Sequence, residues 1–168
     1  WENYQVILGD QMYVNRGYKI SKIVKNGFSS LKILKKNIFA FKKENQNIKL
    51  HFDFFHGVGI LDKAIDVLDE KERNDFRKFV NTNKSFNREN MFICRSKKLM
   101  NEYFLSVFTW LEKCEQIFGF DLKGYAKTRV YTFLAERYIS YWFNKYSNPL
   151  SWPIFFFDTN KNKLNLRK

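Results

Sequence analysis

Residues 126–146, which read AKTRVYTFLAERYISYWFNKY, carry the strongest structural signal in the sequence. Apolar residues recur here every three or four positions, the spacing that places side chains on one face of an α-helix. This broad apolar face is formed by Val130, Phe133, Leu134, Tyr138, Tyr141 and Trp142. Asn148-Pro149 ends the pattern, because the residue before a proline disfavours helical backbone. The stretch therefore predicts a long helix that packs against a core.

A second long helix is predicted upstream of the first. Ser96 is a residue type typical of a helix N-cap, and Gly119 is typical of a helix end. Apolar residues between them again recur at helical spacing: Leu99, Tyr103, Val107, Trp110, Leu111, Cys114 and Phe118. Because most aromatic residues of the two helices fall on these apolar faces, we expect them to form the core.

The segments around these helices are shorter. Strands are predicted at three apolar runs, residues 4–8, 91–94 and 153–157, and the last of them is expected to be buried. Residues 51–59 are aromatic and are predicted to be turn-like, and residues 81–90 are predicted to be a polar loop.

Two further helices are predicted between these strands. Leu61, Ile65 and Leu68 share one face of the first. The second begins at Asp69, where Glu72 follows at the spacing of a capping box. Few strands and several helices make the predicted class a mixed, helix-rich α/β fold.

The composition of this chain of 168 residues excludes a disordered segment, since 45% of its residues are hydrophobic and 19% are aromatic. Its length predicts one domain over residues 1–168. Thirty Lys and Arg against 17 Asp and Glu give a formal net charge of +13. That charge favours a polyanionic partner: nucleic acid, an anionic membrane face or a phosphorylated small molecule. Abundant Lys, Asn, Ile and Phe are also the bias of an AT-rich genome, so charge carries only part of its usual weight.

Residues 15–47 are the least regular part of the sequence. They are basic and polar, and their apolar residues favour helical pieces that are broken near Gly27, Phe28 and Ser29. We interpret them as a basic insertion, which is either helical or a mobile flap.

Local motifs identify no cofactor site. No phosphate-binding loop, dinucleotide fingerprint or paired-cysteine metal site is found, and Cys94 and Cys114 are expected to be reduced, buried thiols. His51 and His56 flank Asp53, but this spacing matches no strong ligand pattern, so no metal site is predicted. Nucleic-acid binding is not favoured either, because most aromatic residues fall on the predicted core faces.

The long C-terminal helix contains three charged residues that suggest chemistry. Arg129 and Glu136 lie seven positions apart, so they project from one side of the helix, and Arg137 follows directly. Burial raises the pKa of a carboxylate and a neighbouring guanidinium lowers it, and such tuning suits a general base. An ion pair with a purely structural role accounts for the same spacing.

Two stretches together resemble a family of predicted glycosyltransferases from bacterial capsular and exopolysaccharide gene clusters. The first is residues 87–93, Asn-Arg-Glu-Asn-Met-Phe-Ile, and the second is residues 129–137, Arg-Val-Tyr-Thr-Phe-Leu-Ala-Glu-Arg. The resemblance extends from about His56 to Trp142. The family's first strands and its His-Tyr-Arg-Arg-like segment are absent, and the chain begins with Trp1. We therefore expect the C-terminal portion of a larger glycosyltransferase-like domain.

The resemblance implies a glycosyltransferase-A-like fold, with a central mixed sheet flanked by helices, and roles for particular residues. Glu136 is the expected catalytic base, which deprotonates the acceptor hydroxyl. Arg137 or Arg129 would offset the charge of the departing diphosphate. The other expected substrate-binding residues are Asn90, His56 and Arg88. A divalent Mn or Mg ion is common in similar enzymes, but no ligands for it are identifiable in this sequence.

The expected function is transfer of a sugar from a nucleotide-sugar donor to a sugar or lipid-linked glycan acceptor of a surface polysaccharide. The expected location is the cytoplasm, where positive charge holds the protein against an anionic inner membrane. The alternative is a non-catalytic basic module that binds a polysaccharide-assembly partner or nucleic acid.

Overall fold

Helices dominate the computed structural model, which describes residues 2–160 and 163–166. The helices are α1 (Ile20–Lys25), α2 (Gly27–Lys36), α3 (Ile48–His56), α4 (Ile60–Asp66), α5 (Glu70–Thr82), α6 (Lys97–Phe118), α7 (Tyr125–Thr128) and α8 (Val130–Tyr146), with a 3-10 turn η1 (Lys43–Asn45). The strands are β1 (Val6–Gly9), β2 (Gln11–Tyr13), β3 (Ser85–Asn87), β4 (Phe92–Cys94), β5 (Pro149–Trp152), β6 (Phe155–Asp158) and β7 (Lys163–Leu166).

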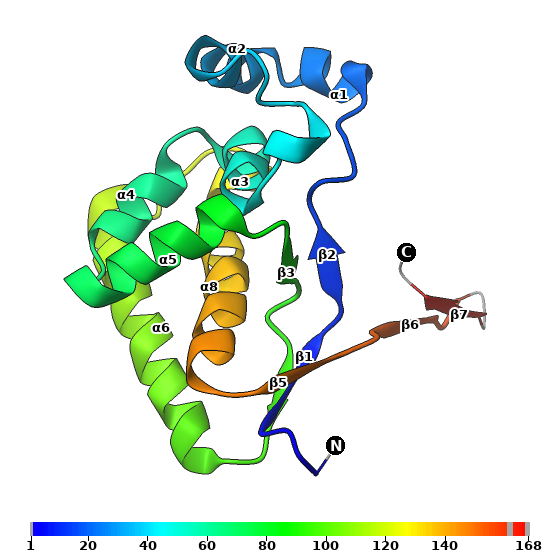
Figure 1. Ribbon diagram of the computed structural model, residues 1–168, viewed down its shortest axis with the longest axis vertical. Coiled ribbons are helices and arrows are strands. Elements are labelled where there is room, and N and C mark those ends of the chain that lie inside the picture. The colour runs from blue at the N-terminus through cyan, green and yellow to red at the C-terminus, as the bar shows by residue number, and fades with distance from the viewer. Residues whose placement is uncertain (1, 161–162, 167–168) are drawn as a thin grey trace.

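The strands form small sheets beside the helices (Figure 1). Strand β1 lies at the centre of the largest sheet, antiparallel to β4 and parallel to β5. Strands β2 and β3 form a separate antiparallel pair, and β6 and β7 form a hairpin that extends away from the helices. This arrangement confirms the prediction of a helix-rich α/β fold with a mixed sheet.

The core lies where α6 and α8 pack against each other and against α3, α4 and α5. Trp110 of α6 stacks on Tyr138 of α8, with ring centroids 4.7 Å apart. Its indole Nε1 donates a hydrogen bond of 2.6 Å to the carbonyl of Ala64 in α4. Ser96 caps α6 by accepting a hydrogen bond from the backbone N of Leu99, as its residue type predicts.

Asn87, at the end of β3, connects three other parts of the fold. Its side-chain amide donates to the carbonyl of Gly9 in β1 at 2.6 Å and to the hydroxyl of Ser151 in β5 at 3.0 Å. Its backbone N donates to Ser140 Oγ in α8 at 2.6 Å. The buried Asn87 therefore fixes the position of α8 relative to both β1 and β5.

Several local predictions are wrong. Residues 51–59 contain most of helix α3 rather than a turn, and residues 81–90 contain strand β3. Residues 153–157 include the start of β6, but Phe155 and Phe157 are more than half exposed, so this segment is not a buried strand. Helix α5 begins next to Asp69 as predicted, but no side chain caps it.

The basic segment contains α1, α2 and η1, and the break between the first two helices falls at Asn26, next to its predicted position near Gly27, Phe28 and Ser29. It packs on the outer side of α3 through a small separate apolar cluster that contains Ile33, Ala40 and Phe54. In Figure 1 these helices lie at the opposite end of the molecule from the sheet of β4, β1 and β5. Among the helices in the described part of the chain, none is both long enough and apolar enough to cross a membrane.

Candidate functional site

A cavity of about 390 Å³ between α3, α8 and the turn that follows β3 is lined by ionisable side chains that could take part in catalysis or bind a ligand. Its charged and imidazole side chains are His51, His56, Arg88, Glu89, Glu136 and Arg137. The structure thus brings together four of the predicted site residues: His56, Arg88, Glu136 and Arg137.

Arg137 is the central residue of this site, and its side chain is only 1% exposed. Its Nη1 donates to Glu136 Oε2 at 2.8 Å and to the carbonyl of Phe133 at 3.0 Å. The guanidinium also lies 4.2 Å from the centroid of the Phe86 ring. Burial lowers the pKa of Arg137 to about 10, opposed by the nearby Glu136, so Arg137 remains charged at neutral pH.

The two histidines of α3 face the same guanidinium. Nη2 of Arg137 is 3.2 Å from His51 Nδ1 and 3.4 Å from His56 Nε2. Because a guanidinium can only donate, both of these ring nitrogens must accept, and both imidazoles must be neutral. Burial, reinforced by the charge of Arg137, lowers the pKa of His56 to about 3 and holds the pKa of His51 well below its usual value.

The tautomer of His56 follows from this arrangement. With Nε2 accepting from Arg137, the proton of the neutral ring resides on Nδ1. Among the described residues, His56 Nδ1 is buried and has no hydrogen-bond partner. It is therefore a donor that a ligand oxygen in the cavity can satisfy.

Glu136 retains an accessible carboxylate, with 14% of its side chain exposed. Burial raises its pKa, the charge of Arg137 opposes this, and the neighbouring Glu89 raises it further. Glu89 is placed by an unusual turn in which both Glu89 and Asn90 have positive φ angles. A carboxylate with a raised pKa in a cavity is suited to accepting a proton.

Arg88 contributes a second guanidinium to the cavity. Its Nη2 lies 3.3 Å from Asp10 Oδ2 and its Nε lies 4.0 Å from Glu89 Oε1, but this buried Nε has no hydrogen-bond partner among the described residues. Arg137 Nε is likewise buried and without a hydrogen-bond partner in the described part of the chain. Two guanidinium groups with N–H donors still to be satisfied favour an anionic or oxygen-rich ligand.

Two predicted site residues lie outside this group. Arg129 is exposed at the start of α8, where its guanidinium lies 5.4 Å from the ring centroid of Phe133, at the rim of the cavity. Asn90 donates to the carbonyl of Thr132 at 3.0 Å and lines neighbouring hollows instead. His51 is not among the predicted ligand-binding residues, because its segment is predicted to be a turn. A turn gives no indication that His51 and His56 face the same guanidinium.

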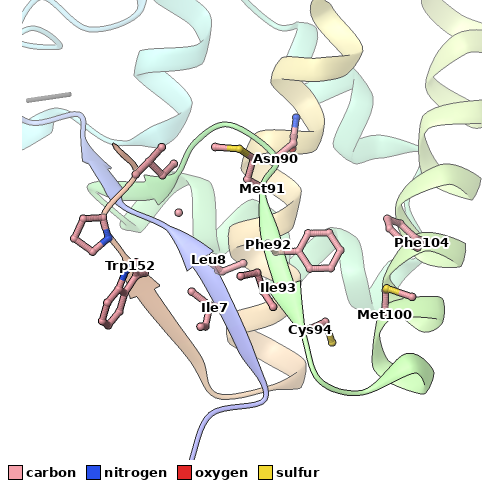
Figure 2. A pocket seen from close by; sticks show the side chains of 13 residues that line it. Ile7, Leu8, Asn90, Met91, Phe92, Ile93, Cys94, Met100, Phe104 and Trp152 are labelled. Carbon is pink, nitrogen blue, oxygen red and sulfur yellow. The ribbon is translucent and has the colours of Figure 1, made fainter. Parts of the chain in front are cut away.

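A larger cavity of about 610 Å³ lies over β4, β1 and the start of α6 (Figure 2). Its wall is apolar, with Phe92 and Phe104 on one side and Trp152 on the other. None of the described residues that line it is acidic, basic or a histidine. It offers space for an apolar group, and the thiol of Cys94 is the single ionisable group among the described residues that line it, so the cavity around Glu136 is the candidate site.

No three His, Cys, Asp or Glu residues within residues 2–160 and 163–166 lie in an arrangement that could hold a metal ion. Asp53, which separates the two histidines in sequence, is instead bound by Lys49 at 2.6 Å and by the backbone N of Gly59 at 3.1 Å. The two cysteines are free: Cys114 is buried, but Cys94 is only partly buried.

Comparison with known proteins gives one match. A family model described as a domain of unknown function (DUF4422) matches residues 12–148, which include every residue of the candidate site. No curated protein and no solved structure matches the chain.

Proposed function

We propose that this chain, which belongs to the DUF4422 family, is part of a glycosyltransferase that moves a sugar from a nucleotide-sugar donor to a hydroxyl group of a surface-polysaccharide acceptor. The observation that carries the proposal is the Glu136–Arg137 pair, held at 2.8 Å in the wall of a cavity that also contains Arg88 and two neutral histidines.

Glu136 is the proposed general base. Burial raises its pKa, so the carboxylate binds a proton more readily than an exposed glutamate does. In the proposed step the acceptor hydroxyl loses its proton to Glu136 while its oxygen bonds to the anomeric carbon of the donor. The bond from that carbon to the diphosphate breaks, and its electron pair leaves with the nucleoside diphosphate.

Arg88 is the proposed contact for the leaving diphosphate. Its Nε has no hydrogen-bond partner among the described residues, and a guanidinium matches the geometry of phosphate oxygens. Arg137 is less suited to this role than the sequence suggests, because both Nη atoms already lie against Glu136, Phe133 and the histidines. We assign Arg137 the role of positioning the base.

Two further residues have proposed roles in substrate binding. His56 Nδ1 can donate to a sugar hydroxyl, since its other ring nitrogen accepts from Arg137. Arg129 at the rim can meet a more distant part of the donor. Asn90 makes its observed contact with the backbone of α8, and we propose that it holds the turn carrying Arg88 in place.

The test measures nucleotide release from a panel of nucleotide sugars, with and without manganese, in the presence of an acceptor glycan. It uses the longest chain that contains this sequence. We expect release from one donor and a loss of about 100-fold or more in Glu136→Gln, the scale of a missing general base. Glu102→Gln, an exposed residue of α6, is the matched control and should keep full activity.

A Glu136→Gln protein with unchanged thermal unfolding and full transfer would remove Glu136 from the mechanism. If no nucleotide sugar is cleaved and none raises the melting temperature, the glycosyltransferase proposal fails. The non-catalytic binding module then becomes the better description, and the basic segment at residues 15–47 is the observation that favours it.

A further inference from the structure

Helices α1 and α2 expose large apolar side chains that the fold leaves uncovered. Ile20 is 79% exposed and Phe28 is 75% exposed, which are high values for such side chains. The exposed apolar side chains of these helices and of the turn after α2 are Ile20, Val24, Phe28, Leu31, Ile38 and Phe39, all more than half exposed. We call these residues, with the exposed lysines around them, the outer face.

The outer face is not needed for packing within the chain. The buried residues of α2 are Ser30 and Ile33, of which Ile33 packs with Phe54 of α3, and α1 has no buried residue. The two short helices are joined to each other and to α3 by polar bonds: Ser30 Oγ donates to the carbonyl of Ile23 at 2.7 Å, and Asn26 donates to the carbonyl of Phe54 at 3.4 Å.

The charge of this surface has a single sign. No acidic residue occurs in the sequence between Asp10 and Glu44. The exposed lysines among and beside the apolar residues are Lys19, Lys22, Lys25, Lys32, Lys35, Lys36, Lys42 and Lys43. Lys32 lies over the ring of Phe28 at 4.4 Å, so cations and apolar groups are interleaved.

We propose that the outer face docks the protein on the surface of an anionic lipid bilayer, lying in the plane of the interface. Apolar side chains enter the boundary between headgroups and acyl chains, and the surrounding lysines contact lipid phosphates. Amphipathic segments with a lysine-rich polar side bind membranes in this way. Each lysine near an anionic surface adds about 1 kcal/mol, so the cluster accounts for stable binding.

The composition of the outer face favours lipid over nucleic acid. Four of its six apolar side chains are aliphatic, so they can neither stack on bases nor donate hydrogen bonds to them. Its cations within α1 and α2 are all lysines, which act as point charges and lack the planar fork of arginine. A bilayer can cover the aliphatic groups and the charges together.

Docking through the outer face would also orient the candidate site. Helix α3 carries Phe54 on the side that meets α2 and His51 and His56 on the side that lines the cavity. The cavity therefore lies on the side of α3 that faces away from α2. The docking proposal itself does not depend on the glycosyltransferase activity, since membrane binding is measured without a sugar donor.

The test is sedimentation of the full chain with vesicles of phosphatidylcholine alone and of phosphatidylcholine mixed with phosphatidylglycerol. We expect binding only to the anionic vesicles. Replacing Lys22, Lys25, Lys32 and Lys35 with Glu should weaken binding by about 100-fold or more. Replacing Val24, Phe28 and Leu31 with Ser leaves the charge unchanged and should weaken binding by about tenfold or more.

Matched controls separate the outer face from net charge and general hydrophobicity. Replacing Lys63, Lys71, Lys98 and Lys123, which are exposed elsewhere in the chain, with Glu changes the net charge by the same amount. Leu105→Ser removes an apolar side chain that is 73% exposed on α6, outside the outer face. Both controls should bind anionic vesicles more tightly than the corresponding outer-face variants.

Circular dichroism should show that every variant is folded, because all substituted side chains are exposed. The proposal is overturned if the serine variant binds vesicles as well as the original chain, or if both lysine variants lose the same amount. It is also overturned if single-stranded DNA binds the outer face more tightly than the vesicles and the serine substitutions leave that binding unchanged.

Discussion

Helices α2 and α8 differ in what covers their apolar residues. In α8 the apolar stripe is covered by the rest of the fold, and even the charged Arg137 is buried beside it. In α2 only Ser30 and Ile33 are buried, and Phe28 and Leu31 project into solvent. Helical spacing of apolar residues therefore predicts the helix but does not identify what covers those residues.

Arg137→Ala should give the largest effect and shows how strongly α8 depends on its buried contacts. The substitution leaves Glu136 without its cation and both histidines without their donor, so we expect the free energy of unfolding to fall by about 3–5 kcal/mol. Urea unfolding measures it. Lys32→Ala removes an exposed cation from α2 and should leave stability almost unchanged. Equal losses in the two variants would contradict the comparison.

The same substitution at one leucine of α8 and one leucine of α2 tests how much each helix depends on burial. Leu134 of α8 is fully buried, and Leu31 of α2 is 61% exposed. Leu134→Ala should lower the free energy of unfolding by about 3 kcal/mol, because it removes buried methyl groups and leaves a cavity. Leu31→Ala should change it by less than about 0.5 kcal/mol. A large loss at Leu31 in the absence of lipid would show that the outer face packs against the protein itself.

The smallest expected effect is a pH dependence of stability that arises at the candidate site and not at the outer face. The pKa of His56 is lowered to about 3 in the folded chain, whereas an unfolded histidine titrates near 6.5. Between these values the unfolded chain binds a proton that the folded chain does not, so lowering the pH favours unfolding. Each pH unit in this window costs up to about 1.4 kcal/mol per histidine.

His56→Gln isolates this contribution, because Glu136, whose raised pKa acts in the opposite direction, is present in both proteins. Between about pH 7 and pH 5.5 the original chain should lose more stability in urea unfolding than the variant. Vesicle binding should stay constant over the same range, since lysines remain charged. Parallel stability losses in the two proteins would show that His56 is not held neutral in the folded chain.

The sequence predicts the parts of the fold in which one face of a helix is buried. Helix α6 begins after Ser96 and ends before Gly119, as its capping residues indicate. Helix α3 was missed because it is covered on two sides: Phe52 enters the main core and Phe54 enters the smaller cluster. Aromatic residues on both faces obscure the helical period, and the capping contact from Asn47 to Leu50 is a weak signal by itself.

The capping box at Asp69 failed for a different reason. Glu72 has the right spacing, but its carboxylate is bound by the hydroxyl of Tyr141 at 2.8 Å and by Lys145 at 2.6 Å. These partners lie about 70 positions away in the chain, so no local pattern contains them. Strands β2 and β3 are three residues long and were missed because so short a segment shows no reliable alternation.

The candidate site is partly predictable from the sequence. Glu136 and Arg137 stand out because charged residues among aromatic ones on a core helix need partners. The sequence does not show that His51 and His56 provide them from α3, since that contact depends on tertiary packing. The position of Asn90 against α8 depends on the positive φ angles of its turn, which its residue type permits without requiring.

The hydrogen bonds of Asn87 have a consequence for how this family can evolve. Both amide hydrogens are used, one on Gly9 and one on Ser151, while Ser140 meets the backbone on the other side. Aspartate would lose both donors and leucine would lose every side-chain hydrogen bond, so we expect neither residue to be tolerated at this position. We expect Asn87 and Ser140 to be inherited together across the family, with substitutions at one accompanied by substitutions at the other.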